Sequence, residues 1–226
     1  LSKLKIRGTF YCQGTMVEEF PLLVRELSVR HLIGSHGYNH ENYGGQRLSS
    51  YWTPDQPEPL KTKEEKLSLI NKCREIHQRV IGYAPQVFVA PFNSIDYDLL
   101  DILDNSEFKV DSSFNNYRLG LATAFFRPQS FNIYELPLSV LRFAEYGYKN
   151  VLQGLTLDYD KITEVLRQEI VLITCHPYEF IEIKVPHPAH VLIVGKKKIE
   201  TLKKLIRDLL NAGYAFVDAL QLLERK

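Results

Sequence analysis

The chain has 226 residues, of which 45% are hydrophobic and 24% are charged, and its formal net charge at pH 7 is +1. This length suits one α/β domain with a large buried core, and the composition excludes a disordered or fibrous chain. A nucleic-acid partner is not expected, because the only dense basic run, Lys196–Lys198, opens an amphipathic pattern where it should be solvated.

The three cysteines, Cys12, Cys73 and Cys175, are widely spaced and form no C-x-x-C pair, which argues against a disulfide framework or a zinc knuckle. No apolar run approaches the roughly 20 residues that a membrane span needs, and no signal-peptide pattern opens the chain. We therefore expect no membrane partner. A cytoplasmic location is favoured, with an extracytoplasmic one as the alternative.

Short β-rich runs alternate with amphipathic patterns along the chain. The predicted strands are residues 7–13, 31–36, 87–92, 110–114, 131–138, 170–176 and 214–217. The predicted helices are residues 17–29, 64–81, 96–106, 158–168 and 197–211. This alternation predicts parallel strands joined by helical crossovers, in either an open sheet or a closed barrel.

Two segments bear on how the domain is organised. The opening residues, LSKLKIRG, have the pattern of a helix end that runs into a strand, so we expect one further strand before them. Residues 1–226 are thus predicted to form a single domain that is incomplete at its N-terminus. Residues 41–63 are rich in Gly, Ser, Pro and Asp and predict a long loop, which in a compact domain is usually functional or mobile.

The strongest candidate for chemistry is the run His36-Gly37-Tyr38-Asn39-His40, which follows a predicted strand. Two imidazoles four residues apart on a helical turn face the same side and can share one metal ion. The end of a parallel strand is also where α/β proteins collect ligands. The alternative is a pair of surface or capping histidines on a polar turn.

His176 and Asp111 also fall at predicted strand ends. His176 can give a proton to a leaving group, or it can simply cap the turn that follows. Asp111, followed by two serines, can orient a histidine or contact a substrate, although an Asp-Ser turn accounts for it equally well. Among the other histidines, His187 and His190 fit a loop, and His31 and His77 are expected at the surface.

Six motifs in this order resemble the polysaccharide deacetylase family, carbohydrate esterase family four. They are Gly8–Gly14 (GTFYCQG), Ile33–His40 (IGSHGYNH), Phe88–Phe92 (FVAPF), Asp111–Ser113 (DSS), Glu135–Pro137 (ELP) and Ile173–Pro177 (ITCHP). Together they cover nearly the whole chain, and several spaced motifs are far more specific than any one of them.

The resemblance implies a distorted (β/α) barrel of about seven parallel strands and a hydrolase that removes an acetyl group from an N-acetylated sugar or polysaccharide. It implies a divalent metal, usually zinc, with cobalt or nickel as alternatives, and it assigns His36 and His40 as metal ligands. His176 matches the family's general acid. Pro91, Phe92 and Leu136 match wall positions of the substrate groove, and the partner is a carbohydrate.

The sequence departs from the family pattern in two places. The Thr-Phe-Asp-Asp run that supplies the base and the third ligand is expected before Thr9, outside these residues. Val89 stands where relatives carry an arginine that pairs with the base. A catalytically silent barrel that binds a saccharide or a partner therefore stays an alternative, as does a related hydrolase of small amides or cyclic imides.

Overall fold

The structure is a computed structural model, and it describes residues 1, 4–44, 61–114, 127–128, 130–143, 147–181 and 196–225. The chain divides into two compact units. Unit 1 consists of Leu1–Phe114, Phe125–Leu136 and Phe216–Lys226. Unit 2 consists of Asn115–Ala124 and Pro137–Ala215. The single domain expected from the sequence stays a prediction, and each unit is described by itself.

Unit 1 is built on a five-stranded parallel sheet, with the strands in the order β1-β2-β3-β4-β5. The strands are β1 (Thr9–Cys12), β2 (Leu32–Ser35), β3 (Val87–Phe88), β4 (Val110–Asp111) and β5 (Tyr134–Glu135). Each lies within one of the first five predicted strands, so the predicted parallel α/β sheet is confirmed. Because the strands are parallel, their carboxyl ends meet at one edge of the sheet.

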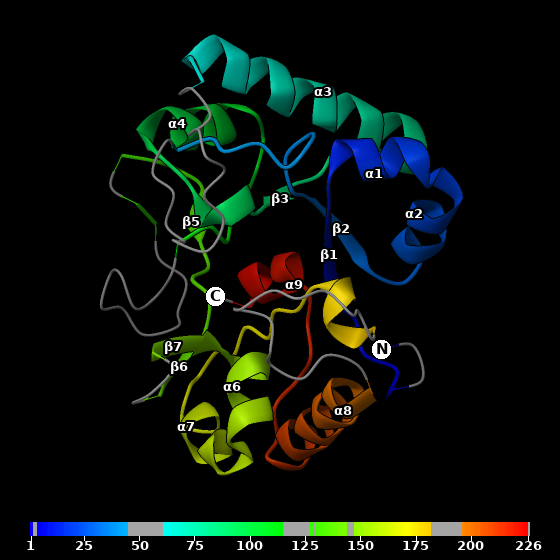
Figure 1. Cartoon of the computed structure of the whole chain (residues 1–226). Helices are drawn as coiled ribbons and strands as arrows, with labels where there is room; N and C mark the ends of the chain where they lie inside the picture. Colours follow the sequence, from blue (N-terminus) through cyan, green and yellow to red (C-terminus); the bar gives the residue numbers. More distant parts are fainter. Residues whose placement is uncertain are drawn as a thin grey trace, which may run out of the picture. The chain divides into compact units, whose positions relative to one another are not determined.

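The helices of unit 1 are α1 (Gly14–Glu19), α2 (Pro21–Ser28), α3 (Lys63–Ile81), α4 (Tyr97–Asn105) and α9 (Ala219–Glu224), with the 3₁₀ helix η2 (Pro91–Asn93). The long helix α3 runs beside α1, α2 and α4 (Figure 1). Thr62 caps its start through a reciprocal box with Glu65, and Gly82 ends it in a left-handed conformation.

Helix α3 contributes to two buried clusters in unit 1. Ile70 packs with Phe88 and Leu99 in the cluster on the side of α4. Ile76 packs with Val17 and Ile33 in the cluster on the side of α1 and α2. The apolar positions at three- and four-residue intervals that predict α3 therefore reflect its contacts with α4 on one side and with α1 and α2 on the other.

Unit 2 contains a two-stranded antiparallel sheet and several helices. These elements are β6 (Val140–Phe143), β7 (Gly147–Asn150), α6 (Val151–Leu157), η3 (Tyr159–Lys161), α7 (Ile162–Val165), η4 (Pro177–Phe180) and α8 (Lys196–Asn211). Helix α6 contacts both strands of the hairpin and α8. Tyr159 of η3 donates a hydrogen bond to Asp208 of α8 at 2.5 Å, which joins these helices.

The last two predicted strands are wrong. Residues 171–176 have no regular secondary structure, and the backbone N–H of Leu172 donates to the Ser139 hydroxyl at 2.8 Å rather than to a neighbouring strand. Residues 214–217 also have no regular secondary structure, and they follow the end of α8, where the Tyr214 N–H donates to the Leu209 carbonyl at 3.0 Å. The apolar residues 170–174 are only half-buried, and no strand among the described residues pairs with them, as a strand requires.

Two further expectations are corrected. His31 and His77, expected at the surface, are both buried. His77 lies one turn after Cys73 on the inner face of α3, where its Nδ1 donates to the Cys73 carbonyl at 2.8 Å, and burial lowers its pKa. His187 and His190 lie outside the described residues. No helix in the described ranges combines the length and apolarity needed to span a bilayer.

Candidate functional site

The histidine run forms a turn at the carboxyl end of β2. Its backbone is fixed against the start of α1, because Gly14 N donates to the Gly37 carbonyl at 3.0 Å and Thr15 N donates to the Tyr38 carbonyl at 2.9 Å. Gly37 and His40 have left-handed backbone conformations, with φ of 72° and 57°. The expected helical geometry is therefore wrong, since these positive φ values lie outside the right-handed helical region.

The two histidine side chains of this turn nevertheless lie together. The ring centroids of His36 and His40 are 5.1 Å apart, with an angle of 68° between the ring planes. Nδ1 of His36 lies 2.8 Å from the Val89 carbonyl oxygen, which can only accept, so Nδ1 carries the proton. In the neutral ring the lone pair is then on Nε2, as in many metal-binding histidines whose other nitrogen donates to a carbonyl.

The Glu41 side chain stabilises the histidine turn through hydrogen bonds to its backbone. Its carboxylate accepts from the backbone N–H groups of Tyr38 and Asn39, at 3.0 and 2.9 Å, and from the Tyr43 hydroxyl at 3.2 Å. Tyr43 is fully buried, and burial followed by the charge of Glu41 raises its pKa. In the sequence these two residues stand only at the edge of the predicted long loop, and the proximity of Glu41 to the histidine run is the one available signal.

Phe92 borders the histidine pair. It lies in η2 with φ of 59°, and Asn93 beside it has φ of 51°, so two consecutive non-glycine residues are left-handed. This turn brings the Phe92 ring edge-on to the His40 ring at a centroid distance of 4.6 Å and leaves the side chain 39% exposed. Pro91, before it, is buried. Of this pair, Phe92 therefore offers apolar surface beside the histidines.

Two other predicted substrate residues, Asp111 and Leu136, are buried, with 0% and 1% exposure. The Asp111 carboxylate accepts from the Ser113 hydroxyl at 2.6 Å, and the same hydroxyl oxygen accepts from Ala90 N at 2.8 Å. Asp111 thus links the ends of β3 and β4 in this structure. A role for Asp111 and Leu136 in contacting substrate stays a prediction.

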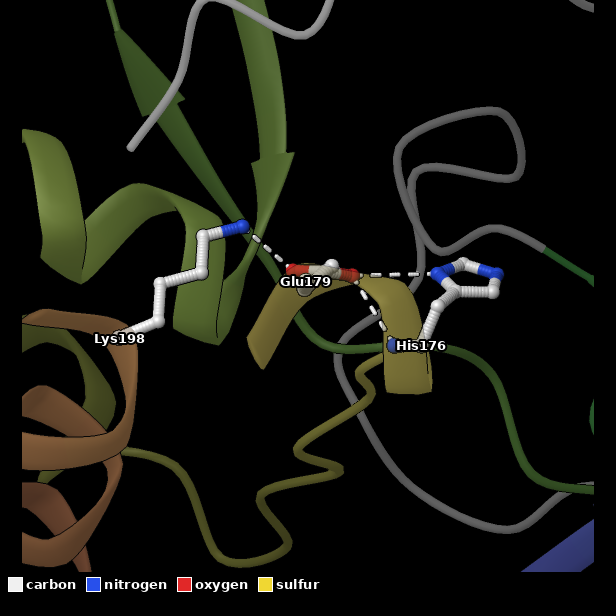
Figure 2. Close-up of polar contacts among 3 residues, drawn as sticks. All are labelled: His176, Glu179 and Lys198. Atoms are coloured by element: carbon white, nitrogen blue, oxygen red, sulfur yellow. Dashed lines mark hydrogen bonds and ion pairs between the residues drawn. The ribbon is translucent and has the colours of Figure 1, made fainter. Parts of the chain in front are cut away.

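In unit 2, His176 lies at the start of η4 and is held by a buried carboxylate (Figure 2). Oε1 of Glu179 accepts from both the backbone N–H and Nδ1 of His176, at 3.0 and 3.1 Å. Oε2 of Glu179 accepts from Nζ of Lys198 at 2.5 Å. The His176 side chain is 56% exposed, whereas those of Glu179 and Lys198 are 2% and 3% exposed.

The charge of Lys198 shapes the electrostatics of this group. Burial raises the pKa of Glu179, but the hydrogen bonds from His176 and Lys198 and the Lys198 charge outweigh burial and hold it below its ordinary value. Glu179 is therefore an anion at neutral pH. The sequence pattern does not single out Glu179 and wrongly predicts a solvated Lys198, although an acidic residue three positions after a candidate acid is a readable signal.

The histidine pair fits two positions of a metal site. The tautomer of His36 and the proximity of His40 suit shared coordination of one ion through imidazole nitrogens. Within the described part of the chain, however, no three His, Cys, Asp or Glu side chains are grouped so as to hold a metal. The described residues therefore fit a metal only as an incomplete set of ligands.

The fold and this turn define an α/β protein with a candidate two-histidine metal site at the carboxyl edge of a parallel sheet. Residues 1–110 match the family model for polysaccharide deacetylase. A peptidoglycan-N-acetylglucosamine deacetylase of Bacillus cereus is 30% identical over 99 residues, which are 42% of this chain and 30% of the relative. The resemblance drawn from the motifs is thus confirmed: residues 1–110, just under half of the chain, match the polysaccharide deacetylase family.

Solved structures agree on the fold. A CE4 family pseudoenzyme from Bacillus anthracis, BA3943, has a TM-score of 0.57 and 14% identity, with 99% of this chain and 57% of that chain covered. A variant of the peptidoglycan deacetylase PdaC from Bacillus subtilis has a TM-score of 0.52 and 18% identity, with 99% and 79% covered. At these identities the likeness concerns the fold, and a closed barrel of seven strands stays a prediction.

Proposed function

We propose that the protein is a metal-dependent hydrolase that removes the acetyl group from an N-acetylated sugar or polysaccharide. The observation that carries this proposal is the histidine turn at the carboxyl edge of the sheet, where His36 and His40 lie with ring centroids 5.1 Å apart. The family match supports the reaction class. It covers residues 1–110, and the curated relative is matched over only 30% of its length, so the activity rests on this proposal.

His36 and His40 would hold a divalent metal, most simply zinc, with cobalt or nickel as alternatives. The metal would polarise the acyl carbonyl and lower the pKa of a bound water. The remaining ligand and the base would come from the aspartates predicted before Thr9. Phe92 would border the sugar, because its half-exposed ring lies beside His40.

His176 would act as the general acid. Its Nδ1–H is committed to Glu179, so Nε2 is the nitrogen that would deliver a proton to the departing amine. The products would be acetate and the free amino sugar. An N-acetylglucosamine polymer is the first substrate to test, because the Bacillus cereus relative carries that substrate in its name. The cytoplasmic location, with an extracytoplasmic alternative, also stays a proposal.

The experiment is acetate release from a soluble oligomer of N-acetylglucosamine, measured on zinc-loaded protein from the complete reading frame. His36→Ala and His40→Ala should each abolish turnover and stoichiometric metal together. His176→Ala should bind metal normally yet lose most turnover, by a factor of about 100 or more for a general acid. Full activity in all three variants would refute the proposal.

A catalytically silent barrel that binds a saccharide is the second candidate. It is favoured by the absence of a three-residue ligand group among the described residues and by Val89 at the family's arginine position. A pseudoenzyme also occurs among proteins of this fold. This candidate predicts saccharide binding without acetate release in zinc-loaded protein, and isothermal titration with the same oligomer separates the two.

A further inference from the structure

Glu179 and Lys198 form an ion pair in which both charged side chains are almost completely buried. Their side chains are 2% and 3% exposed, and Nζ of Lys198 lies 2.5 Å from Oε2 of Glu179. Removing such charges from water costs several kcal/mol, and apolar residues of similar size are often at least as stabilising. The pair is therefore poorly explained by stability alone.

The geometry around Glu179 indicates instead that the ion pair orients the His176 side chain. One carboxylate oxygen, Oε2, is committed to Lys198, and the other, Oε1, accepts from both the backbone N–H and the ring Nδ1 of His176. Figure 2 shows the carboxylate between the side chains of His176 and Lys198. Because both of its oxygens are bonded, the carboxylate cannot rotate without breaking a charge-assisted hydrogen bond.

The exposed partner in this group is the imidazole. Its side chain is 56% exposed, and its ring stacks on Tyr178 with a centroid distance of 5.0 Å and an interplanar angle of 17°. Glu179 fixes the ring from the Nδ1 side, and Tyr178 supports one ring face. A solvent-accessible histidine is thereby restricted in both tautomer and direction.

We propose that Glu179, held in place by Lys198, is the positioning residue of His176: it keeps the proton on Nδ1 and thereby makes Nε2 the nitrogen that exchanges a proton with substrate. The proton-transfer role rests on the function proposed above. The tautomer assignment does not, because it follows from the contacts of unit 2 alone.

The test uses ¹⁵N-histidine-labelled protein from the complete reading frame, with the His176 ring signals assigned by their loss in His176→Ala. Spectra are recorded at about pH 8.5, two units above the ordinary imidazole pKa. Two double variants remove the buried charges together. Glu179→Leu/Lys198→Met removes the acceptor, whereas Glu179→Gln/Lys198→Met keeps an amide oxygen that can accept from Nδ1. Glu200→Gln/Lys203→Met is the matched control, because Glu200 and Lys203 form an exposed ion pair on α8, the helix that also carries Lys198.

The parent, the glutamine double variant and the control should show His176 protonated at Nδ1. The leucine double variant should show both tautomers in exchange. An Nε2 proton in the parent, or a retained single Nδ1 tautomer in the leucine variant, would overturn the proposal. The parent spectrum is decisive even if the leucine variant fails to fold, which circular dichroism reports.

The kinetic arm separates this inference from the proposed function. In an active protein the leucine variant should lose about 10- to 100-fold in kcat, as is typical when a supporting residue is removed, with KM nearly unchanged, and the glutamine variant should recover most of it. An unchanged kcat in the leucine variant would refute the positioning role. If the parent releases no acetate, the proposed function fails while the tautomer result still decides the role of Glu179.

Discussion

Asp111 and Glu135 lie directly opposite each other in the neighbouring parallel strands β4 and β5, and both side chains are fully buried. Ser113 donates to one oxygen of Asp111, and Phe114 N donates to one oxygen of Glu135. The remaining oxygens, Oδ2 and Oε2, have no donor among the described residues. A proton shared between the two carboxyl groups would supply the missing donor, and the pair would then carry a single negative charge.

This pair should make stability fall as the pH rises. Burial raises the pKa of Asp111 to about 6, and burial with the charge of Asp111 raises the pKa of Glu135 well above its ordinary value. A raised folded-state pKa stabilises the fold below the unfolded value, about pH 4, and this contribution is lost as the pH rises through the folded pKa. Glu135→Gln keeps a donor for Asp111 at every pH.

The melting temperature of Glu135→Gln should therefore equal that of the parent near pH 4 and exceed it near pH 8. Glu200→Gln serves as the control. Glu200 is exposed and its pKa is lowered through its hydrogen bond with Lys203, so it does not contribute to a fall in stability with rising pH, and its variant should keep the fall seen in the parent. Identical slopes for the parent and Glu135→Gln would contradict the shared proton.

Removing the carboxylate of Glu41 should loosen the histidine turn. Glu41→Ala leaves two backbone N–H groups and the buried Tyr43 hydroxyl without their acceptor, at a cost of about 2–4 kcal/mol in the free energy of unfolding. Glu41→Gln, which keeps one acceptor oxygen, should lose less. Urea unfolding measures both, and equal stability of Glu41→Ala and the parent would show that the turn does not depend on these bonds.

Metal removal should destabilise the complete protein if His36 and His40 are ligands. Metal present at about 100 times its dissociation constant stabilises the folded state by about 2.7 kcal/mol, and a chelator should remove that increment. His176→Ala should show the same shift as the parent, whereas His36→Ala should show none. A chelator-induced shift of full size in His36→Ala, followed by calorimetry, would exclude that residue as a ligand.

Gly34 should not tolerate a methyl group. A Cβ at this position of β2 would lie 2.7 Å from both Tyr11 Cδ1 and Val87 Cγ2, side-chain atoms of the two neighbouring strands. Overpacking of this kind typically costs about 1–3 kcal/mol, so Gly34→Ala should lower the urea midpoint.

Gly8→Ala is the matched control for Gly34→Ala, because its nearest neighbour would be the movable side-chain end of Leu1 at 3.1 Å. Its urea midpoint should change little. Equal midpoints for the two variants would mean that β1 and β3 move apart at little cost.

The sequence predicted the first half of the fold well, because its signals are local. The apolar spacing and the capping residues of α3 specify a helix regardless of what it packs against, and Gly82 marks its end. The five strands of unit 1 follow the same rule, since each is bounded by turn or helix signals. The sequence did not predict the antiparallel strands β6 and β7, in which Val140 is paired with Asn150.

The candidate site was predictable to the extent that its residues are neighbours in sequence. His36 and His40 share one turn, so their proximity follows from spacing, while the left-handed angles at Gly37 and His40 depend on the bonds to α1 and Glu41. The contact of Lys198 with Glu179 could not be predicted from the sequence. A run of three lysines has the same pattern whether all of them are solvated or one of them pairs with a buried carboxylate.

The link from His176 through Glu179 to Lys198 also gives the protein an internal reporter. Lys198 lies in the first turn of α8, so the hydrogen bond that holds the Glu179 carboxylate in place exists only while that helix is docked against η4. The imidazole nitrogen signals therefore register the packing of a helix 20 residues further along the chain. A denaturant titration followed at His176 would measure the local unfolding free energy of α8 from a single side chain.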